Sequence, residues 1–218
     1  MGGGGGTIIG IVGYSAILDP YPLGPPLMTG LTEAVADRPD VRVENFTWSP
    51  VHVVQRFETG EMARPSRIVL IGSAAVSTEP GLVRAFRWTG GERDPLEVQE
   101  RIYEAVTGIV DLENTLMIGA QFGVWPEETF TVEADLPSDT FGRMVMADND
   151  GVSDDAGFEE RIGFSPARQR QDLVRTAAAL ARHGRTAEIS WLDKSADRLA
   201  RVRPFTETHF AVASGGRT

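Results

Sequence analysis

The 218-residue sequence contains no cysteine, which excludes disulfide bonds, thiolate metal sites and cysteine nucleophiles. No apolar run approaches the roughly 20 residues that a membrane-spanning helix needs. The N-terminal segment also lacks the basic stretch and apolar core of a signal peptide. We therefore expect a cytoplasmic protein.

Basic charge is scarce as well. The chain has 21 Lys and Arg residues against 31 Asp and Glu residues, which gives a formal net charge of −10. Surfaces that follow nucleic-acid phosphates need clustered cations, and so do surfaces that bind anionic lipid. We therefore expect neither nucleic acid nor membrane as a partner. Hydrophobic residues make up 41% of the chain, which is typical of a folded globular protein.

Ligands for a metal ion are few. The three histidines, His52, His183 and His209, include no pair at helical i, i+4 spacing. The acidic stretch DNDGVSDDAGFEE, residues 148–160, has Val152 where a calcium loop needs its third ligand, which favours a solvated acidic loop. The glycine patterns of dinucleotide-binding and phosphate-binding loops are absent, and so is G-x-S-x-G. We predict no bound metal or cofactor.

What the sequence does contain is an alternation of strand and helix patterns. Short Ile- and Val-rich runs bounded by glycine predict strands, and amphipathic runs that begin at proline predict helices. The predicted strands are Thr7–Gly13, Val41–Trp48, Arg67–Gly72, Gly81–Trp88 and Thr115–Gly119, with a possible one at Thr129–Glu133, and the predicted helices cover 25–37 and begin near Pro50, Pro95 and Pro166. This order predicts a three-layer α/β fold with a mostly parallel central sheet and helices on both faces.

The expected domain organisation follows from the same pattern. Residues 1–6 form a flexible glycine tail, residues 7–184 a single α/β domain, and residues 185–218 a C-terminal extension. We expect an acidic insertion at about 128–160, because this region does not continue the strand and helix alternation.

Ligands of parallel sheets bind beyond the carboxyl ends of the strands, so the loops at 13–24, 72–80 and 119–127 are the candidate site. The first loop, GYSAILDPYPLGPP, has one acid, Asp19, among four prolines. Ser73 follows a predicted central strand. Each also has a purely structural reading, because Asp-Pro often starts a turn and a small residue often ends a strand.

Four stretches, taken in order, carry a family resemblance. They are IIGIVGYSAILDPYPLG at 8–24, VRVENFTWSPVHVV at 41–54, RIVLIGSAAVSTEPGLVRAF at 67–86, and LMIGAQFGVWPE at 116–127 followed by RIGFSPARQRQDLVRTAAALA at 161–181. The chain thereby resembles the nickel–iron hydrogenase maturation endopeptidases. The resemblance implies an α/β protein that trims a C-terminal peptide from the hydrogenase large subunit after nickel insertion, with nickel recognised in the substrate.

The departures from that family are informative. Carried over by position, its three metal-ligating residues fall on Pro20, Ser73 and Leu96, and Tyr14 stands in place of an asparagine. Proline and leucine offer no ligand, and a serine hydroxyl is a poor one. The resemblance therefore implies a pseudoenzyme whose nickel-recognising ligands are replaced.

Three functions compete on this basis. The first is a non-proteolytic protein that binds a peptide or protein partner as an assembly or scaffold factor. The second is an active endopeptidase or other hydrolase, with a rearranged site, that processes a protein C-terminus. The third is a small-molecule or nucleotide binder on the same scaffold. Asp19 and Ser73 are the candidate catalytic residues, and the candidate binding residues are Tyr14, Tyr21, His52, Glu97 and Gln121.

Overall fold

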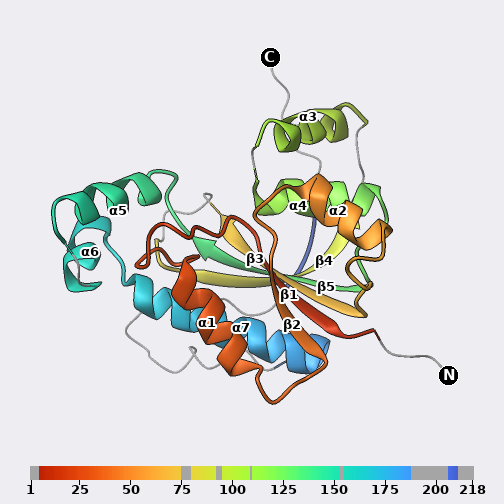
Figure 1. The fold of residues 1–218 in the computed structure, drawn as a ribbon, viewed down its shortest axis with the longest axis horizontal. Helices are drawn as coiled ribbons and strands as arrows, with labels where there is room; N and C mark the ends of the chain where they lie inside the picture. The colour runs from red at the N-terminus through yellow and green to blue at the C-terminus, as the bar shows by residue number, and fades with distance from the viewer. Residues whose placement is uncertain are drawn as a thin grey trace.

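The computed structural model describes residues 5–74, 80–91, 95–108, 110–152, 155–187 and 206–210. Their strands form one sheet in the order β2-β1-β3-β5-β4-β6, with helices on both faces (Figure 1). Strands β1, β2, β3 and β5 are parallel, β4 runs antiparallel to β5, and β6 runs parallel to β4. The predicted three-layer α/β fold with a mostly parallel sheet is confirmed.

The bounds of the elements are as follows. The strands are β1 Thr7–Ile11, β2 Val41–Asn45, β3 Arg67–Ala74, β4 Val83–Gly91, β5 Glu128–Asp135 and β6 Thr206–Phe210. The helices are α1 Pro25–Ala34, α2 Pro50–Glu58, α3 Pro95–Val106, α4 Leu112–Gln121, α5 Thr140–Asn149, α6 Asp155–Ile162 and α7 Pro166–His183, which a 3-10 turn, Gly184–Thr186, follows. Within the described residues, no helix is both long enough and apolar enough to cross a membrane.

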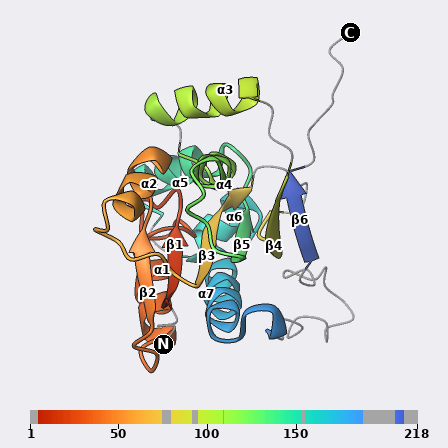
Figure 2. The same ribbon diagram turned by 90° about the vertical axis from the view of Figure 1, so that its right-hand side faces the viewer.

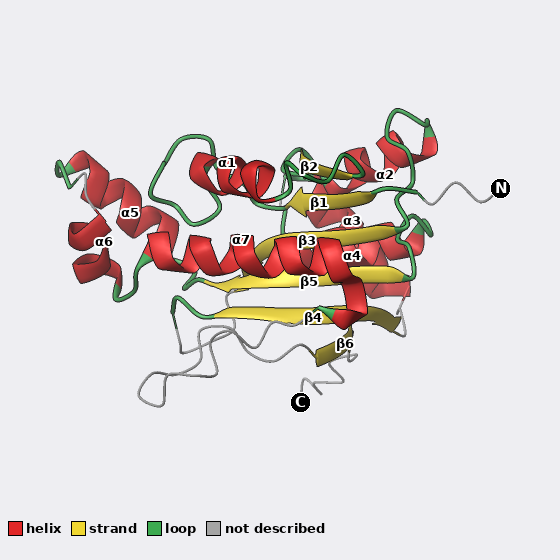
Figure 3. Ribbon diagram, turned by 90° about the horizontal axis from the view of Figure 1, so that it is seen from below, coloured by secondary structure: helices red, strands yellow, loops and turns green. Residues whose placement is uncertain are grey.

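The helices cover the sheet in two layers, each over its own hydrophobic cluster. Helices α1 and α7 lie on one face, and α2 and α4 lie on the other, with α3 outside α4 (Figures 1 and 2). The helix-starting signals behave as expected, because Ser49 and Ser165 accept hydrogen bonds from the amides of Val51 and Arg168. Helices α5 and α6 lie beyond the carboxyl ends of the parallel strands (Figure 3).

The strand predicted at Thr115–Gly119 is wrong, because this run lies inside helix α4. Asp111 begins the helix by accepting a hydrogen bond of 2.6 Å from the Asn114 amide. Helix α4 is buried along most of its length, so its apolar run shows little of the alternation that marks a surface helix. A short, uniformly apolar run fits a buried strand and a buried helix equally well.

The possible strand at Thr129–Glu133 is confirmed, and it lies in the middle of the sheet. It forms β5, which pairs with β3 on one side and with β4 on the other. The insertion expected at about 128–160 therefore starts with a core strand, and only α5 and α6 extend away from the sheet (Figure 3). At the other end of the chain, the carbonyls of Gly5 and Gly6 accept hydrogen bonds from the Ser66 amide, which fixes the last residues of the expected glycine tail. The remaining domain boundaries stay predictions.

A close contact between Phe46 and Gly10 holds the loop after β2 against β1. Phe46 follows β2, is 1% exposed, and lies directly over Gly10 of β1. A Cβ atom on Gly10 would lie 2.5 Å from two atoms of the Phe46 ring, well inside van der Waals contact. Glycine at position 10 therefore lets the loop after β2 pack against β1.

We expect Gly10→Ala to destabilise the fold by about 1–3 kcal/mol, as overpacking of a dense core usually does. The matched control is Gly142→Ala in α5, where an added Cβ meets nothing within 4 Å. This control should stabilise the protein by about 0.5–1 kcal/mol, since alanine is the better helix former. Urea unfolding of the three proteins measures both effects, and equal stability of Gly10→Ala and the unmodified protein would contradict this packing account.

Candidate functional site at the carboxyl edge of the sheet

The register of the central strands places the first loop beside the end of β3. Ile11 of β1 pairs with Ile71 of β3, and the Val12 amide donates to the Ile71 carbonyl at 2.7 Å. Two residues further along each strand, Gly13 and Ser73 stand at the same edge of the sheet. Strand order changes direction between β1 and β3, which is where ligands of open α/β sheets bind.

The first loop is joined to the loop after β2. The Tyr14 amide donates a hydrogen bond of 3.0 Å to Thr47 Oγ1, and that hydroxyl lies 3.4 Å from the Tyr14 carbonyl oxygen. The Thr47 amide donates to Asn45 Oδ1 at 2.9 Å. These contacts fix the two loops relative to each other.

Hydrogen bonds inside the first loop make it compact. The Ser15 amide donates to the Leu23 carbonyl, and the Gly24 amide donates to the Tyr21 carbonyl. Leu18 and Leu23 are buried beneath the loop and belong to the hydrophobic cluster under α1 and α7. Ile17, which directly precedes Leu18, is 86% exposed.

Both candidate tyrosines pack against the core. Tyr14 and Tyr21 are half-buried and contact the cluster under α1 and α7. The Tyr21 ring meets the Phe141 ring of α5 edge to face, with centroids 5.4 Å apart. Burial raises the pKa of the Tyr21 phenol, so Tyr21 is a neutral apolar contact that links α5 to the loop.

The two candidate catalytic residues lie at this edge, Asp19 on the first loop and Ser73 at the end of β3. Both are exposed, and no described hydrogen bond or ion pair holds either side chain in place. Their catalytic role stays a prediction.

The residues at the positions carried over from the family's metal-ligating residues do not fit the metal-recognition site that the resemblance implies. Pro20 offers no ligand atom, Leu96 is 67% exposed, and Ser73 brings a single hydroxyl. Over the part of the chain that the structure describes, no three His, Asp or Glu side chains come together as a metal site would require.

The other candidate binding residues are spread out. His52 is exposed in the first turn of α2, also at the carboxyl edge. The side chain of Glu97, in α3, lies outside the described residues. Gln121 ends α4 at the opposite edge, because the connection that follows leads to the start of β5 beside Arg67. The structure therefore does not bring Gln121 together with Asp19.

A second polar cluster at the carboxyl edge lies on the sheet face toward α4. Arg84 of β4 pairs directly with Glu133 of β5, and its Nη2 lies 3.4 Å from Glu133 Oε2 and 3.9 Å from Asp135 Oδ2. Burial raises the pKa of Glu133, while the positive charge of Arg84 opposes this shift. A buried carboxyl group with a raised pKa is a feature of many functional sites.

Sequence reasoning missed this cluster, although a signal was present. In FTVEAD, residues 130–135, Thr131, Glu133 and Asp135 alternate with apolar residues, which places all three on one face of a strand. It also missed Ile17 and Trp48, whose signal is a large apolar side chain inside a loop.

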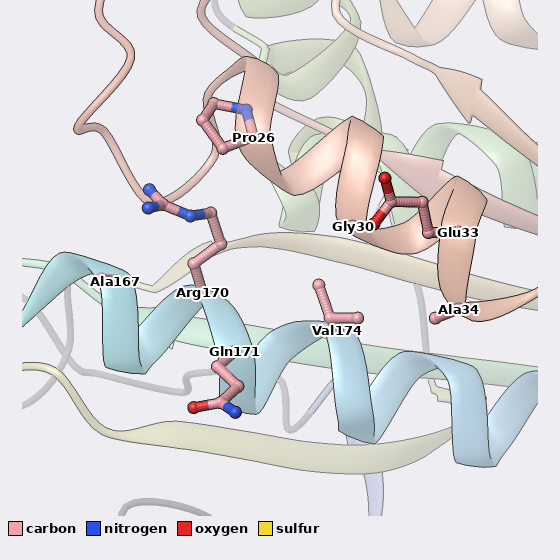
Figure 4. Close-up of a pocket in the computed structure, with 8 residues that line it drawn as sticks. All are labelled: Pro26, Gly30, Glu33, Ala34, Ala167, Arg170, Gln171 and Val174. Atoms are coloured by element: carbon pink, nitrogen blue, oxygen red, sulfur yellow. The ribbon is translucent and has the colours of Figure 1, made fainter.

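A shallow groove of about 510 Å³ runs between α1 and α7 (Figure 4). Gly30 lets the helices approach, because a Cβ there would already lie 3.2 Å from Val174 Cγ2. Pro26, Gly30, Glu33, Ala34, Ala167, Arg170, Gln171 and Val174 line the groove. None of the residues predicted from the sequence is among them.

No protein-family model matches the sequence, and neither does any curated protein. A crystal structure of a hydrogenase 3 maturation protease matches 84% of this chain and 92% of its own, with 14% identity and a TM-score of 0.40. A solution structure of the endopeptidase HycI from Escherichia coli matches 80% of this chain and 90% of its own, with 15% identity and a TM-score of 0.41. At this level of similarity, neither structure assigns a family or an activity to this chain.

The raised pKa of Glu133 predicts a pH-dependent effect on stability. The folded protein holds the Glu133 proton more tightly than the unfolded chain does, so this group favours folding at low pH. That contribution is lost as the pH rises from the ordinary glutamate pKa of about 4.3 through the raised value. We expect Glu133→Gln to gain stability relative to the unmodified protein between about pH 4 and pH 7, measured by urea unfolding. A difference that does not change with pH would contradict the raised pKa.

Proposed function

We propose that this chain is a non-proteolytic protein that binds a peptide or protein partner at the carboxyl edge of its sheet, as an assembly or scaffold factor. A C-terminal tail of a hydrogenase large subunit is the partner that the sequence resemblance implies. The proposal rests on this chain's own residues, and one observation carries it: two large apolar side chains stand exposed on loops that are fixed to each other.

These side chains are Ile17 and Trp48. They are 86% and 81% exposed, although residues of their kind are normally buried. Ile17 lies three residues after Tyr14 and Trp48 lies one residue after Thr47, so the hydrogen-bonded pair Tyr14–Thr47 joins the two loops that carry them. Tryptophan is enriched among the side chains that anchor protein interfaces, and Ile17 adds exposed apolar area on the joined loop.

Helix α5 adds to this apolar surface. Phe141 contacts Tyr21 of the first loop and is 37% exposed. The loop is already compact in the free protein, so little conformational entropy would be lost when a partner binds. We call Ile17, Trp48 and Phe141 the edge surface.

Proteolysis has less support from these residues. Asp19 and Ser73 are exposed and no described contact orients them, whereas a catalytic group needs a partner within hydrogen-bond reach, directly or through one water. Of the three residues at the family's metal-ligating positions, only Ser73 has a side-chain oxygen, its hydroxyl.

A hydrolase with a rearranged site is the second candidate, and Glu133 is the observation that favours it. A carboxyl group whose pKa is raised by burial can act as a general acid or base near neutral pH. In this case Glu133, rather than Asp19, would activate water.

The edge surface can be tested by partner capture from the native host. Tagged protein is compared with Ile17→Asp, Trp48→Ala and Phe122→Asp variants, and captured proteins are quantified by mass spectrometry. Phe122 is the matched control, since it is 45% exposed directly after Gln121, at the opposite edge of the sheet. We expect the first two variants to lose at least tenfold of one captured partner, because an interface anchor contributes about 2 kcal/mol or more, and Phe122→Asp to retain it.

The captured partner then separates binding from hydrolysis. We expect the mass of the partner to be unchanged after incubation with the unmodified protein, and Asp19→Asn to bind as well as the unmodified protein. A shortened partner whose cleavage is lost in Glu133→Gln would support the hydrolase instead. Equal capture by all variants would rule out the edge surface.

A further inference from the structure

The outer side of β2 is an open edge of the sheet. Strand β2 ends the strand order, with β1 on its inner side only (Figure 2). The ladder to β1 begins at the Asp40 carbonyl, which accepts from the Thr7 amide, and it ends at the Phe46 amide. In a parallel pair every second residue bonds to the neighbouring strand, so Arg42 and Glu44 supply the bonds between these two ends.

The residues that alternate with them face the other way. The main-chain groups of Val43 and Asn45 point away from β1, and among the described residues no group bonds to them. The Val41 amide donates to the Arg38 carbonyl, while the Val41 carbonyl also points outward. The edge therefore presents a row of main-chain donors and acceptors at the spacing of a β ladder.

This edge has little of the protection that edge strands usually carry, such as a proline, a bulge or a covering element. Strand β2 contains no proline and pairs with β1 without a register shift, and its main contacts with described elements are with β1 and α1. Its charged side chains, Arg42 and Glu44, project from the face toward α2, where Glu44 pairs with Arg56. Arg42 is exposed and Val43, Glu44 and Asn45 are only half-buried, whereas β1 is buried throughout.

The chemistry of the edge selects its ligand. Main-chain donors and acceptors at β spacing are matched by another extended main chain, as in the recognition of peptides by strand addition. A helix does not match them, because its main-chain groups bond to one another. The half-buried Val43 side chain packs against the cluster under α1 and α7, and it offers apolar contact to alternate side chains of an added strand.

We propose that β2 binds an extended segment of the partner as an added strand. Trp48 follows Asn45 by three residues, so a peptide that pairs with β2 and continues past its carboxyl end reaches the edge surface. The inference rests on the proposed function and names how the main chain of the partner is held. Strand β2 supplies hydrogen bonds that do not depend on the partner's sequence, and Ile17 and Trp48 supply the side-chain contacts.

The probe is a phage-displayed library of random linear peptides, selected on the unmodified full chain. We expect Val43→Pro to weaken binding of the selected peptides at least tenfold, because proline removes an N–H that faces the added strand. The fold should tolerate this change, since β1 does not use that N–H and proline is accepted at such positions of edge strands. Val43→Thr is the matched control, because it keeps the N–H and the branched shape, and it should retain the peptides.

Hydrogen exchange measured by NMR tests the same contact without a variant. In the free protein, the amides of Val43 and Asn45 should exchange rapidly, and those of Arg42 and Glu44 should exchange slowly because they bond to β1. A selected peptide should slow the first pair at least tenfold and leave the second pair unchanged. N-methylation of alternate peptide residues should abolish binding in one of its two registers and spare it in the other.

Failure to select any peptide, equal binding by Val43→Pro, or unchanged exchange of the Val43 and Asn45 amides would overturn the proposal. Peptides that bind Val43→Pro but not Trp48→Ala would support the edge surface and rule out strand addition. Failure here is thus distinguishable from failure of the proposed function, because partner capture through Ile17 and Trp48 is measured independently.

Discussion

The hydrogen bond between the Tyr14 amide and Thr47 Oγ1 is the contact on which the candidate binding surface depends. It joins the loops that follow β1 and β2, and Phe46, next to Thr47, packs over Gly10 of β1. Without this link, Ile17 and Trp48 would stand on independent loops, and ordering them on a partner would cost conformational entropy. With it, the carboxyl edge carries an apolar surface whose shape is set before binding.

The carboxyl edge of the sheet carries two groups of residues with different chemistry. On the loops after β1 and β2, Ile17 and Trp48 are exposed over a backbone that is hydrogen-bonded within and between the loops. On β4 and β5, Arg84 Nη2 lies 3.4 Å from Glu133 Oε2 and 3.9 Å from Asp135 Oδ2 in a mostly buried cluster. The proposed function assigns partner binding to the first group, whereas a hydrolase would use the second.

Most of the fold could be predicted from the sequence, because capping signals and strand alternation are local. Ser49 and Ser165 begin their helices as expected, and Arg67–Gly72 lies inside the sheet. Local patterns failed at Thr115–Gly119, since burial on most sides of α4 removes helical periodicity. Of the candidate site, Tyr14, Tyr21, Asp19 and Ser73 could be placed at one edge, whereas Gln121 could not, because its position depends on α4 being a helix. The contacts of Arg84 with Glu133 and Asp135 depend on the long-range pairing of β4 with β5, which no local pattern reveals.

The most direct test of the account is the hydrogen exchange of the Tyr14 amide in the free protein, measured by NMR with and without Thr47→Val. If the two loops are fixed to each other, this amide exchanges far more slowly than an exposed loop amide, and Thr47→Val accelerates its exchange while weakening capture of the partner. Rapid exchange of the Tyr14 amide in the unmodified protein, or capture that survives the loss of protection, would contradict a preformed binding surface at this edge.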